Sequence, residues 1–539
     1  MELKDKIKAI IPQAVFSETG ELVVTLLPDD FRRVAETLRH DKEEPMDYLR
    51  DIVGMDWGDA LGTLYYLEST VTYRRITLKT STADREQPFL PSVCDLWKTA
   101  EIKEREVYDF FGIRFLNNPD MRRIYLREDW KGYPLRKDYD MDSNPLDLDN
   151  EVNSDTTEEY YLNSDGTIKG HENTVFDRDA FVVNIGPQHP STHGVLRMRV
   201  SLQGETICKV DPILGYIHRG IEKLNEGLTY PQTLAFTDRL DYLSAHQNRH
   251  ALCMCIEKAA GIEISERAQY IRTIMDELQR IDSHLLFYSC LVMDMGGLTP
   301  FFYGFREREM ILDIFEETTG GRLIQNYNMI GGVQADLHPD FQKKVKAFIK
   351  HLRSVIKDYH DIFTGNVIAT TRLKGVGVLS REDVISLGAT GGTGRASGWA
   401  NDVRKHHPYA LYDKVDFREI TYTEGDSFAR YMVRMDEIME SCKIIEQLID
   451  NIPEGEYRVK TKAIIKLPEG VFSSSVETSR GEFCVVLESH GDKYPYRLHY
   501  RSTGLPLVHA MDTACRGTKI ADLIAIGGTL DFVIPDIDR

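Results

Sequence analysis

The sequence predicts an α+β protein with two folded parts of unequal size. Three observations support this fold class: alternating strand-like and helix-like runs over residues 1–140, an acidic stretch over 141–175, and apolar stripes at helical spacing from residue 268 onward. We expect a small N-terminal α+β domain (1–140), an acidic linker (141–175) and a larger domain (176–539) that is mainly helical, with a β region at its start.

The N-terminal elements follow from local hydropathy and turn residues. ELVVTLL (21–27) is a predicted strand, the segment that begins with Pro28 is a predicted helix over 28–39, and 61–70 and 74–82 form a predicted antiparallel pair. Charged and aromatic residues then crowd together over 104–115 and 120–139. Such a stretch is either an ion-paired docking surface or a solvated loop over a hydrophobic edge, and composition favours the loop.

The predicted linker is defined by its charge. Residues 140–179 include twelve acidic and two basic residues, a local charge of −10 out of −19 for the whole chain. The stretch shows little apolar periodicity, so we expect it to act as a tether between the two domains.

The second domain begins with a predicted strand (181–185), a turn rich in Gly and Pro, and an alternating strand (195–203). Apolar residues then recur at steps of three and four, which predicts a helical bundle with these stripes in its core. The stripes are Ala268, Ile271, Met275, Leu278, Ile281 and Leu285; Phe341, Val345, Phe348, Leu352 and Ile356; and Phe428, Met432, Met435, Met439, Cys442 and Ile445.

Composition narrows the class of protein. The 539 residues are 42% hydrophobic and 28% charged, which is typical of a soluble globular protein. The net charge of −19 argues against nucleic acid as the main partner, because phosphate binding needs dense positive charge. The sequence shows neither a bilayer-spanning apolar run nor a secretory signal. We expect a cytoplasmic chain, either free or held against a membrane within a larger assembly.

The eight cysteines are scattered, and without a secretory signal they do not indicate a disulfide framework. Cys253 and Cys255 are the only close pair. Two positions apart on a helix, their side chains diverge by about 200°. Reduced core thiols are therefore favoured over a metal site.

Two glycine-rich segments invite functional interpretations. GATGGTGRASG (388–398) matches neither a phosphate loop nor a dinucleotide fingerprint, so a mobile or tightly packed loop is the default. In GPQHPSTHG (186–194) the prolines forbid the helix that would align His189 with His193, which excludes a zinc site of the HExxH type. One of these histidines can still present a proton donor to a cavity, or both can stabilise the turn.

Tyr242 lies within TDRLDYLSAHQNRH (237–250), which we predict to be helical, with Arg239 one turn earlier and His246 one turn later. A tyrosine at this spacing is usually a partly buried amphipathic residue. Alone it predicts no function.

Longer motifs resemble a known family. GPQHPSTHGVLR (186–197), DPILGYIHRGIEKL (211–224), TYPQTLAFTDRLDY (229–242), GLTPFFYGFRERE (297–309), SRGE (479–482) and DIDR (536–539) resemble the D subunit of respiratory complex I, the proton-translocating NADH:quinone oxidoreductase. EREVYDFFGIRF (104–115) and RRIYLREDWKGYPLRKDY (122–139) resemble its C subunit. Over about 1–140 and 176–539, the chain is similar to a natural fusion of the two bacterial subunits.

The D subunits are related to the large subunit of nickel-iron hydrogenases, so the resemblance implies a hydrogenase-like fold for the second domain. Hydrogenases bind their metal through RxCGxC and DPCxxCxxR motifs, which fall on 239–244 and 531–539 here. The four thiolate positions become Asp241, Ser244, Val533 and Asp536. Because the thiolates are missing, we expect no bound metal. We also expect the cavity that holds the metal in hydrogenases to be empty and free to bind another ligand.

In the family this cavity receives the quinone headgroup. The motifs place the catalytic tyrosine at Tyr242, the histidine at His193 and its acidic partner at Asp294, with His189 on the same loop of the quinone cavity. A phenol and an imidazole suit quinone oxygens that become hydroxyls, and a carboxylate can orient the imidazole.

The resemblance also implies partners. Arg219 and Arg239 match arginines that the family places near the terminal iron-sulfur cluster, which a neighbouring subunit ligates. The cluster and FMN would reside in other subunits, and quinone would be the substrate of this chain. The expected partners are the terminal-cluster subunit and the membrane arm, with the chain peripheral on the cytoplasmic side of the bacterial inner membrane.

Three alternatives remain open. An equivalent subunit of a complex fed by ferredoxin or reduced deazaflavin would share these motifs, because the electron-input module lies elsewhere. A membrane-bound hydrogenase large subunit is disfavoured by the missing thiolates. A purely structural scaffold is disfavoured because Tyr242, His193 and Asp294 are retained.

One position departs from the family. Many members continue a GxRM motif with a histidine beside the terminal cluster, whereas the corresponding run here is GGRLIQ (320–325), with Ile324 in that place. Isoleucine cannot titrate. We expect a lower and nearly pH-independent cluster potential, suited to a low-potential acceptor such as menaquinone.

Overall fold

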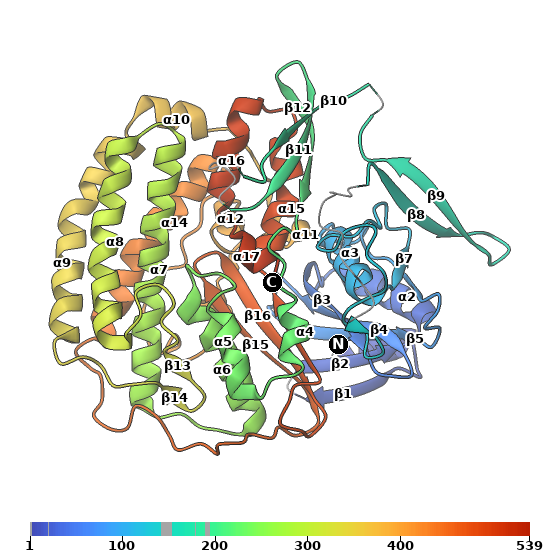
Figure 1. Ribbon diagram of the computed structural model, residues 1–539, viewed down its shortest axis with the longest axis horizontal. Coiled ribbons are helices and arrows are strands. Elements are labelled where there is room, and N and C mark those ends of the chain that lie inside the picture. Colours follow the sequence, from blue (N-terminus) through green and yellow to red (C-terminus); the bar gives the residue numbers. More distant parts are fainter. Residues whose placement is uncertain (1–2, 20, 142–153, 178, 189–193) are drawn as a thin grey trace.

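The computed structural model describes residues 3–19, 21–141, 154–177, 179–188 and 194–539. Figure 1 shows a smaller N-terminal part built on a sheet, on the right, against a larger part whose long helices lie on the left. The predicted α+β fold class is confirmed.

The N-terminal part is built on a five-stranded sheet with the order β1-β2-β5-β4-β3, in which β2 and β5 run parallel and the other neighbours antiparallel. Its elements are α1 (Leu3–Ile10), β1 (Val15–Thr19), β2 (Glu21–Leu26), α2 (Pro28–Arg39), β3 (Tyr48–Asp56), β4 (Leu61–Glu68), β5 (Arg75–Thr82) and α3 (Thr99–Phe111). The predicted strand, helix and antiparallel pair correspond to β2, α2 and β4 with β5. Helix α2 begins at Pro28, whose fixed φ suits the first helical position.

The charged stretch that follows is folded and ion-paired. Residues 104–111 lie in α3, and Arg123 Nη1 lies 2.9 Å from Asp109 Oδ1. Arg122 Nη2 lies 2.9 Å from Asp211 Oδ1 in the second part of the chain. The favoured interpretation as a solvated loop is therefore wrong, because each of these buried charges has an opposite charge beside it. Composition alone does not reveal such pairing.

Half of the predicted linker forms a hairpin instead of a tether. Strands β6 (Phe89–Pro91), β7 (Arg114–Leu116), β8 (Thr156–Leu162) and β9 (Ile168–Thr174) form a four-stranded sheet in this order. The hairpin turns at Asp165-Gly166, where Gly166 has φ +83°, a conformation that favours glycine. Strand β9 is almost entirely exposed, so its hydropathy gave no strand signal. Residues 142–153 of the predicted linker lie outside the described residues.

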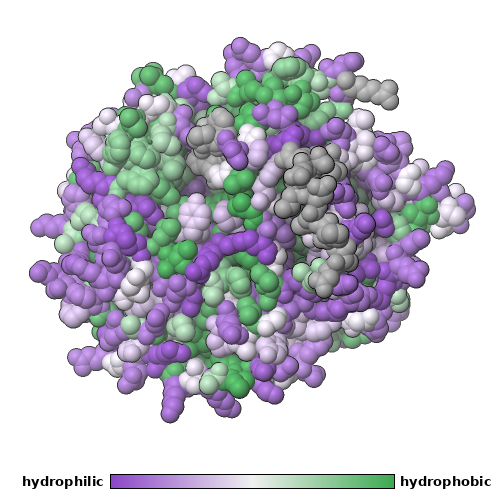
Figure 2. All heavy atoms as spheres, in the orientation of Figure 1, coloured by the Kyte–Doolittle hydropathy of each residue, from purple (hydrophilic) through white to green (hydrophobic). Residues whose placement is uncertain are grey.

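The second part opens with an antiparallel sheet of β10 (Phe181–Ile185), β11 (Arg197–Gln203) and β12 (Thr206–Ile213). The two predicted strands correspond to β10 and β11. Figure 2 shows apolar residues gathered at the top of the molecule, where Figure 1 places this sheet, and Phe181 is 68% exposed there.

The helical body contains the predicted stripes. Its long helices are α6 (Ala245–Ala260), α7 (Glu266–Asp294), α8 (Leu298–Thr319), α9 (Phe341–Tyr359) and α14 (Ser427–Leu448). The stripe that starts at Ala268 is wholly buried along α7, whereas Ile356, Phe428, Met432 and Met439 of the other stripes are only partly buried. Among the described residues, no helix combines the length and the apolarity needed to span a bilayer.

Shorter elements complete the body around these helices. They are α4 (Ile221–Asn225), α5 (Tyr230–Thr237), β13 (Asn328–Met329), β14 (Gly332–Val333), η3 (His360–Thr364), α10 (Val367–Leu373), α11 (Arg381–Leu387), α12 (Gly391–Ala396), α13 (Val403–His406), β15 (Gly470–Thr478), β16 (Gly481–Ser489), β17 (Arg497–Arg501), α15 (Gly504–Cys515), η4 (Ile520–Asp522), α16 (Leu523–Leu530) and α17 (Ile534–Ile537). Strands β15, β16 and β17 form an antiparallel sheet.

The sheet formed by β15, β16 and β17 packs against β3 of the N-terminal part. Buried ion pairs cross this contact: Arg50 Nη2 lies 2.7 Å from Glu482 Oε1, and Asp51 Oδ2 lies 2.9 Å from His499 Nε2. Paired charges of this kind fix how two surfaces dock, since breaking one pair leaves an uncompensated buried charge.

Candidate functional site

Tyr242 lies in the turn between α5 and α6, where the sequence predicted a helix. That prediction is wrong because Asp241 Oδ1 accepts a hydrogen bond from the Leu243 backbone N–H at 3.0 Å, a local bond that competes with helix formation. His246 is not grouped with Tyr242 on one helix face: it is buried in α6, with Nδ1 2.7 Å from Asp276 Oδ1. The tyrosine is half-buried, and burial raises the pKa of its phenol.

A buried guanidinium lies beside Tyr242. Arg480, in the turn between β15 and β16, donates from Nη1 to Asp241 Oδ2 at 3.1 Å and from Nη2 to Asp531 Oδ1 at 3.3 Å. Next to it, Ser244 Oγ and Ser479 Oγ lie 2.6 Å apart. The expectation of an empty cavity is therefore wrong at this point. Two carboxylates at positions of the old metal motifs hold a side-chain cation between them.

The remaining thiolate positions are also enclosed by protein. Val533 is buried, and Asp536 Oδ2 accepts hydrogen bonds from the Ser502 hydroxyl at 2.7 Å and from the Gly504 backbone N–H at 3.0 Å. Burial, followed by the nearby Asp241 carboxylate, raises the pKa of Asp536 to about 6. This end of the chain is a packed wall of the site.

The glycine-rich segment 388–398 supports the turn that carries Arg480. Gly391, the first residue of α12, has φ +66°, and a Cβ atom there would lie 2.4 Å from the carbonyl oxygen of Arg480. The sequence predicted either a mobile or a tightly packed loop here. The segment is tightly packed, and residues 391–396 form a buried helix. Only glycine allows the backbone to approach the turn this closely.

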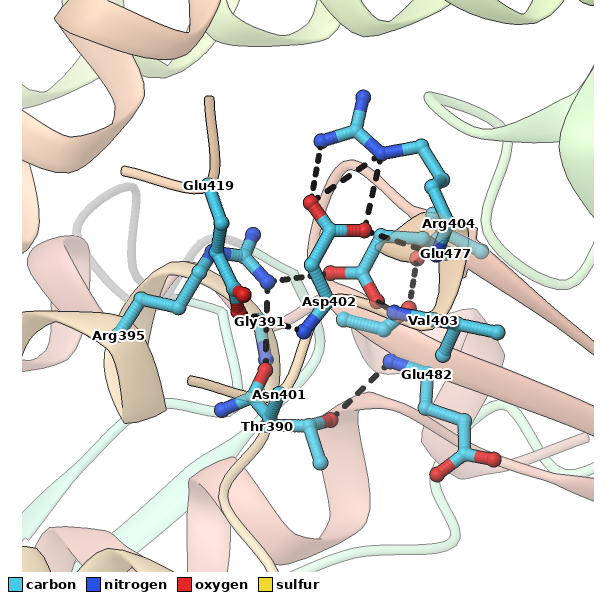
Figure 3. A network of polar contacts seen from close by, with 12 residues as sticks. Thr390, Gly391, Arg395, Asn401, Asp402, Val403, Arg404, Glu419, Glu477 and Glu482 are labelled. Atoms are coloured by element: carbon cyan, nitrogen blue, oxygen red, sulfur yellow. Dashed lines mark hydrogen bonds and ion pairs between the residues drawn. The ribbon is translucent and has the colours of Figure 1, made fainter. Parts of the chain in front are cut away.

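Charged and polar side chains also fix this turn, in the network shown in Figure 3. Arg395 of α12 lies between two carboxylates, with Nη1 2.7 Å from Glu477 Oε1 and Nη2 2.6 Å from Glu437 Oε1. Glu477 also accepts from the Val403 backbone N–H at 3.1 Å. On β16, the Glu482 backbone N–H donates to Thr390 Oγ1 at 3.1 Å. The network holds the ends of β15 and β16, and so sets the position of Arg480.

The C-terminal end of α7 brings Asp294 into the same charged neighbourhood. Cys290, one turn before Asp294, is half-buried, and its pKa is raised to about 11 by burial and then by the Asp294 and Asp531 carboxylates. The Cys290 thiol in turn acts electrostatically on Tyr242. These side chains therefore share one neighbourhood, with Arg480 acting on both Cys290 and Tyr242.

His189 and His193 lie outside the described residues. The chain resumes at Gly194, where an added Cβ atom would lie 2.8 Å from the Ile534 side chain of α17. The residue that follows His193 is thus packed against the helix that carries Asp536. The predicted role of either histidine stays a prediction.

The two predicted cluster-side arginines lie together on the surface. Arg219 and Arg239 are both exposed, and Arg219 Nη2 donates to the Arg239 carbonyl oxygen at 3.1 Å. The loop that contains Ile324 is tied to the same place, because the Asn326 backbone N–H donates to Asp238 Oδ2 at 2.8 Å. Ile324 itself is half-buried.

Sequence reasoning did not single out Cys290, Arg308 or Arg480, although Arg308 and Arg480 act electrostatically on both Tyr242 and Cys290. Arg480 was visible only as part of the SRGE motif, and no periodic pattern indicates that a turn residue reaches Asp241 across the fold. The sole local signal is Gly391, because a glycine at a helix start indicates close backbone contact.

Comparisons with known proteins identify related families for both parts of the chain. Residues 24–145 match the family model of the respiratory-chain NADH dehydrogenase 30 Kd subunit, and 294–469 and 460–539 match that of the 49 Kd subunit. Among solved structures, a chain of the membrane-bound sulfane sulfur reductase, an archaeal respiratory membrane complex, superposes with a TM-score of 0.65 at 32% identity. The match covers 68% of this chain and all of that one.

Curated relatives cover nearly the whole chain. The C/D subunit of NADH-quinone oxidoreductase from Bacteroides fragilis is 70% identical over 516 residues, which is 94% of this chain and 97% of that protein; the Bacteroides thetaiotaomicron protein is 69% identical over the same lengths. The D subunit of the Desulfotalea psychrophila enzyme is 47% identical over 67% of this chain and 97% of its own length. The chain belongs to the family of fused C/D subunits of NADH-quinone oxidoreductase.

Proposed function

We propose that this chain forms, with a neighbouring iron-sulfur subunit, the chamber in which quinone is reduced with electrons from NADH, coupled to proton translocation. The observation that carries the proposal is the half-buried Tyr242 phenol, set against Arg480 where the related hydrogenases have metal-binding thiolates. Asp294 and Cys290 complete the described wall of the pocket. His193 is the second proposed donor, and His189 is proposed to face the same quinone cavity.

The charges around Tyr242 suit proton transfer to a quinone. Reduction places negative charge on the quinone oxygens, and a phenol O–H can donate a proton to one of them. The phenolate that remains is stabilised by Arg480 and Arg308, the two cations that act on Tyr242 and oppose the effect of burial on its pKa. Asp241 and Asp531 hold the Arg480 guanidinium in place.

We assign the exposed pair Arg219 and Arg239 to the contact with the subunit that ligates the terminal cluster. Positive charge near a cluster that accepts electrons favours its reduced form. FMN and the clusters belong to other subunits, and the N-terminal domain serves assembly. The chain sits on the cytoplasmic side of the bacterial inner membrane as a peripheral subunit beside the membrane arm.

The thiol of Cys290 provides a direct test of quinone binding. We expect a soluble quinone analogue at about ten times its dissociation constant to slow alkylation of Cys290 in the intact complex by about tenfold, because only the free pocket reacts. The rate is measured by mass spectrometry of the modified peptide. Cys208, exposed on β12, is the internal control. Equal rates with and without the analogue would contradict the proposed pocket.

We also expect the purified chain to bind no transition metal in stoichiometric amount. Asp241 and Asp531 already hold the Arg480 cation, and a metal ion would have to displace it without thiolate ligands. The measurement is elemental analysis of this chain after it has been dissociated from the purified complex. Stoichiometric nickel or iron on the isolated chain would refute this expectation and favour the hydrogenase alternative.

A further inference from the structure

Asp282 is a buried acid with no role in the chemistry described so far. It lies on α7 with no exposed surface. The Arg308 Nε atom, from α8, lies 3.1 Å from Asp282 Oδ1, and Gln279 Nε2 donates to Oδ2 at 3.1 Å. Burial outweighs these contacts and raises the pKa of Asp282 to about 7. The other charges that act on it are Glu309 of α8 and Arg480.

The same two cations, Arg308 and Arg480, act electrostatically on both Asp282 and Tyr242. Arg480 Nη1 donates both to Ser283 Oγ at 3.0 Å and to Asp241 Oδ2 at 3.1 Å, the chain neighbours of Asp282 and Tyr242. Arg308 acts electrostatically on both Asp282 and Tyr242. The carboxyl group and the phenol therefore belong to one electrostatic neighbourhood.

The polar cluster continues away from the pocket. Gln279 Oε1 accepts a hydrogen bond from Gln325 Nε2 at 2.9 Å, and Gln325 directly follows Ile324. A buried row of polar side chains thus runs from the loop on the proposed cluster side, through Gln279, to Asp282 and Arg308. Its only group that changes charge near neutral pH is Asp282, since Gln does not titrate and Arg stays protonated.

We propose that Asp282 is the buried proton relay that restores Tyr242 after the quinone has taken the tyrosine's proton. The inference rests on the proposed function and names a new residue for it. Two electrons from the partner's cluster and two protons convert the quinone to a quinol. Tyr242 supplies one of these protons and becomes a phenolate. The Asp282 carboxylic acid then gives its proton to the phenolate and becomes a carboxylate beside Arg308.

The pH profile of quinone reduction tests the relay. Asp282 can donate only while protonated, so the rate in the unmodified complex should fall about tenfold for each pH unit above about 7. Asp282→Asn keeps the size of the side chain and the Gln279 contact. In this variant the rate at pH 6 should be about 100-fold lower, and the fall in rate above pH 7, the alkaline limb of the profile, should disappear. Asp282→Glu should retain the fall in rate above pH 7. If Asp282 had a purely structural role, Asp282→Asn would lower the rate but leave this fall in place.

Three further measurements make the outcome decisive. NADH oxidation with an artificial acceptor at the flavin must be unchanged in Asp282→Asn, which shows that the complex is assembled. Asp358→Asn, which removes an exposed acid of α9, should leave rate and profile unchanged. A carboxylic C=O band in the infrared difference spectrum should disappear in Asp282→Asn only.

The parallel variant Tyr242→Phe separates this inference from the proposed function. If Tyr242→Phe loses quinone reduction while Asp282→Asn keeps the normal rate and alkaline limb, the relay is refuted and the quinone site stands. If Tyr242→Phe is fully active, the proposed function itself fails.

Discussion

Replacing Tyr242 with phenylalanine is expected to lower quinone reductase activity by about 100-fold or more, the range typical of a lost acid catalyst. The change removes one hydroxyl and keeps the ring, so packing in the half-buried turn is preserved. The charges that surround the hydroxyl remain, but no proton is available between them. The measurement is the rate of quinone reduction by NADH in the purified complex.

The control for assembly is electron transfer from NADH to an artificial acceptor at the flavin, which should survive in Tyr242→Phe. Tyr270→Phe is a matched substitution, because Tyr270 is also half-buried but lies on α7 against the helical core. It should leave both activities unchanged. Equal loss of both activities in Tyr242→Phe would indicate failed assembly and contradict a specific role for the hydroxyl.

The terminal cluster in the neighbouring subunit is expected to have a potential that is nearly independent of pH between 6 and 8. The family motif aligns Ile324 with a histidine that we expect to take up a proton on reduction in the relatives that carry it, and an isoleucine gives the added electron no compensating charge. The potential should also be lower than in those relatives. A redox titration of the EPR signal of the cluster at several pH values measures both quantities.

Ile324→His is the matched variant for this prediction. It places an imidazole at a half-buried position in the loop tied to Asp238, so the potential should rise and depend on pH. A slope in the unmodified complex near the one-electron limit of about 59 mV per pH unit would contradict the account. Asp282 lies two hydrogen-bonded glutamines away from Ile324, and we assign its proton to Tyr242 instead.

Local signals predicted much of the fold. Helix α2 begins at the expected proline, and the apolar stripe of α7 is buried along its whole length, because both signals act through neighbouring residues. The hairpin of β8 and β9 was missed because β9 is almost entirely exposed and polar and β8 contains two consecutive glutamates, so hydropathy does not distinguish them from a tether. Its turn at Asp165-Gly166 was the available signal.

Only those residues of the candidate site that lie in family motifs could be named from the sequence. Tyr242 and Asp294 come from distant segments, and only the resemblance joined them. The helix predicted over 237–250 is interrupted by a turn at Tyr242 and resumes only at Ala245. Arg480 and Asp282 depend on tertiary contacts of α7 and of the β15–β16 turn. A single sequence does not show which buried charges face each other, because pairing partners lie up to hundreds of residues apart.

Photoaffinity labelling with an azido-quinone in the intact complex tests the quinone pocket most directly. We expect the label to fall on peptides that contain Tyr242, Cys290 or Asp294, and excess natural quinone to suppress it. Displaceable label found only in other subunits, or only on remote surfaces of this chain such as β9, would contradict the pocket.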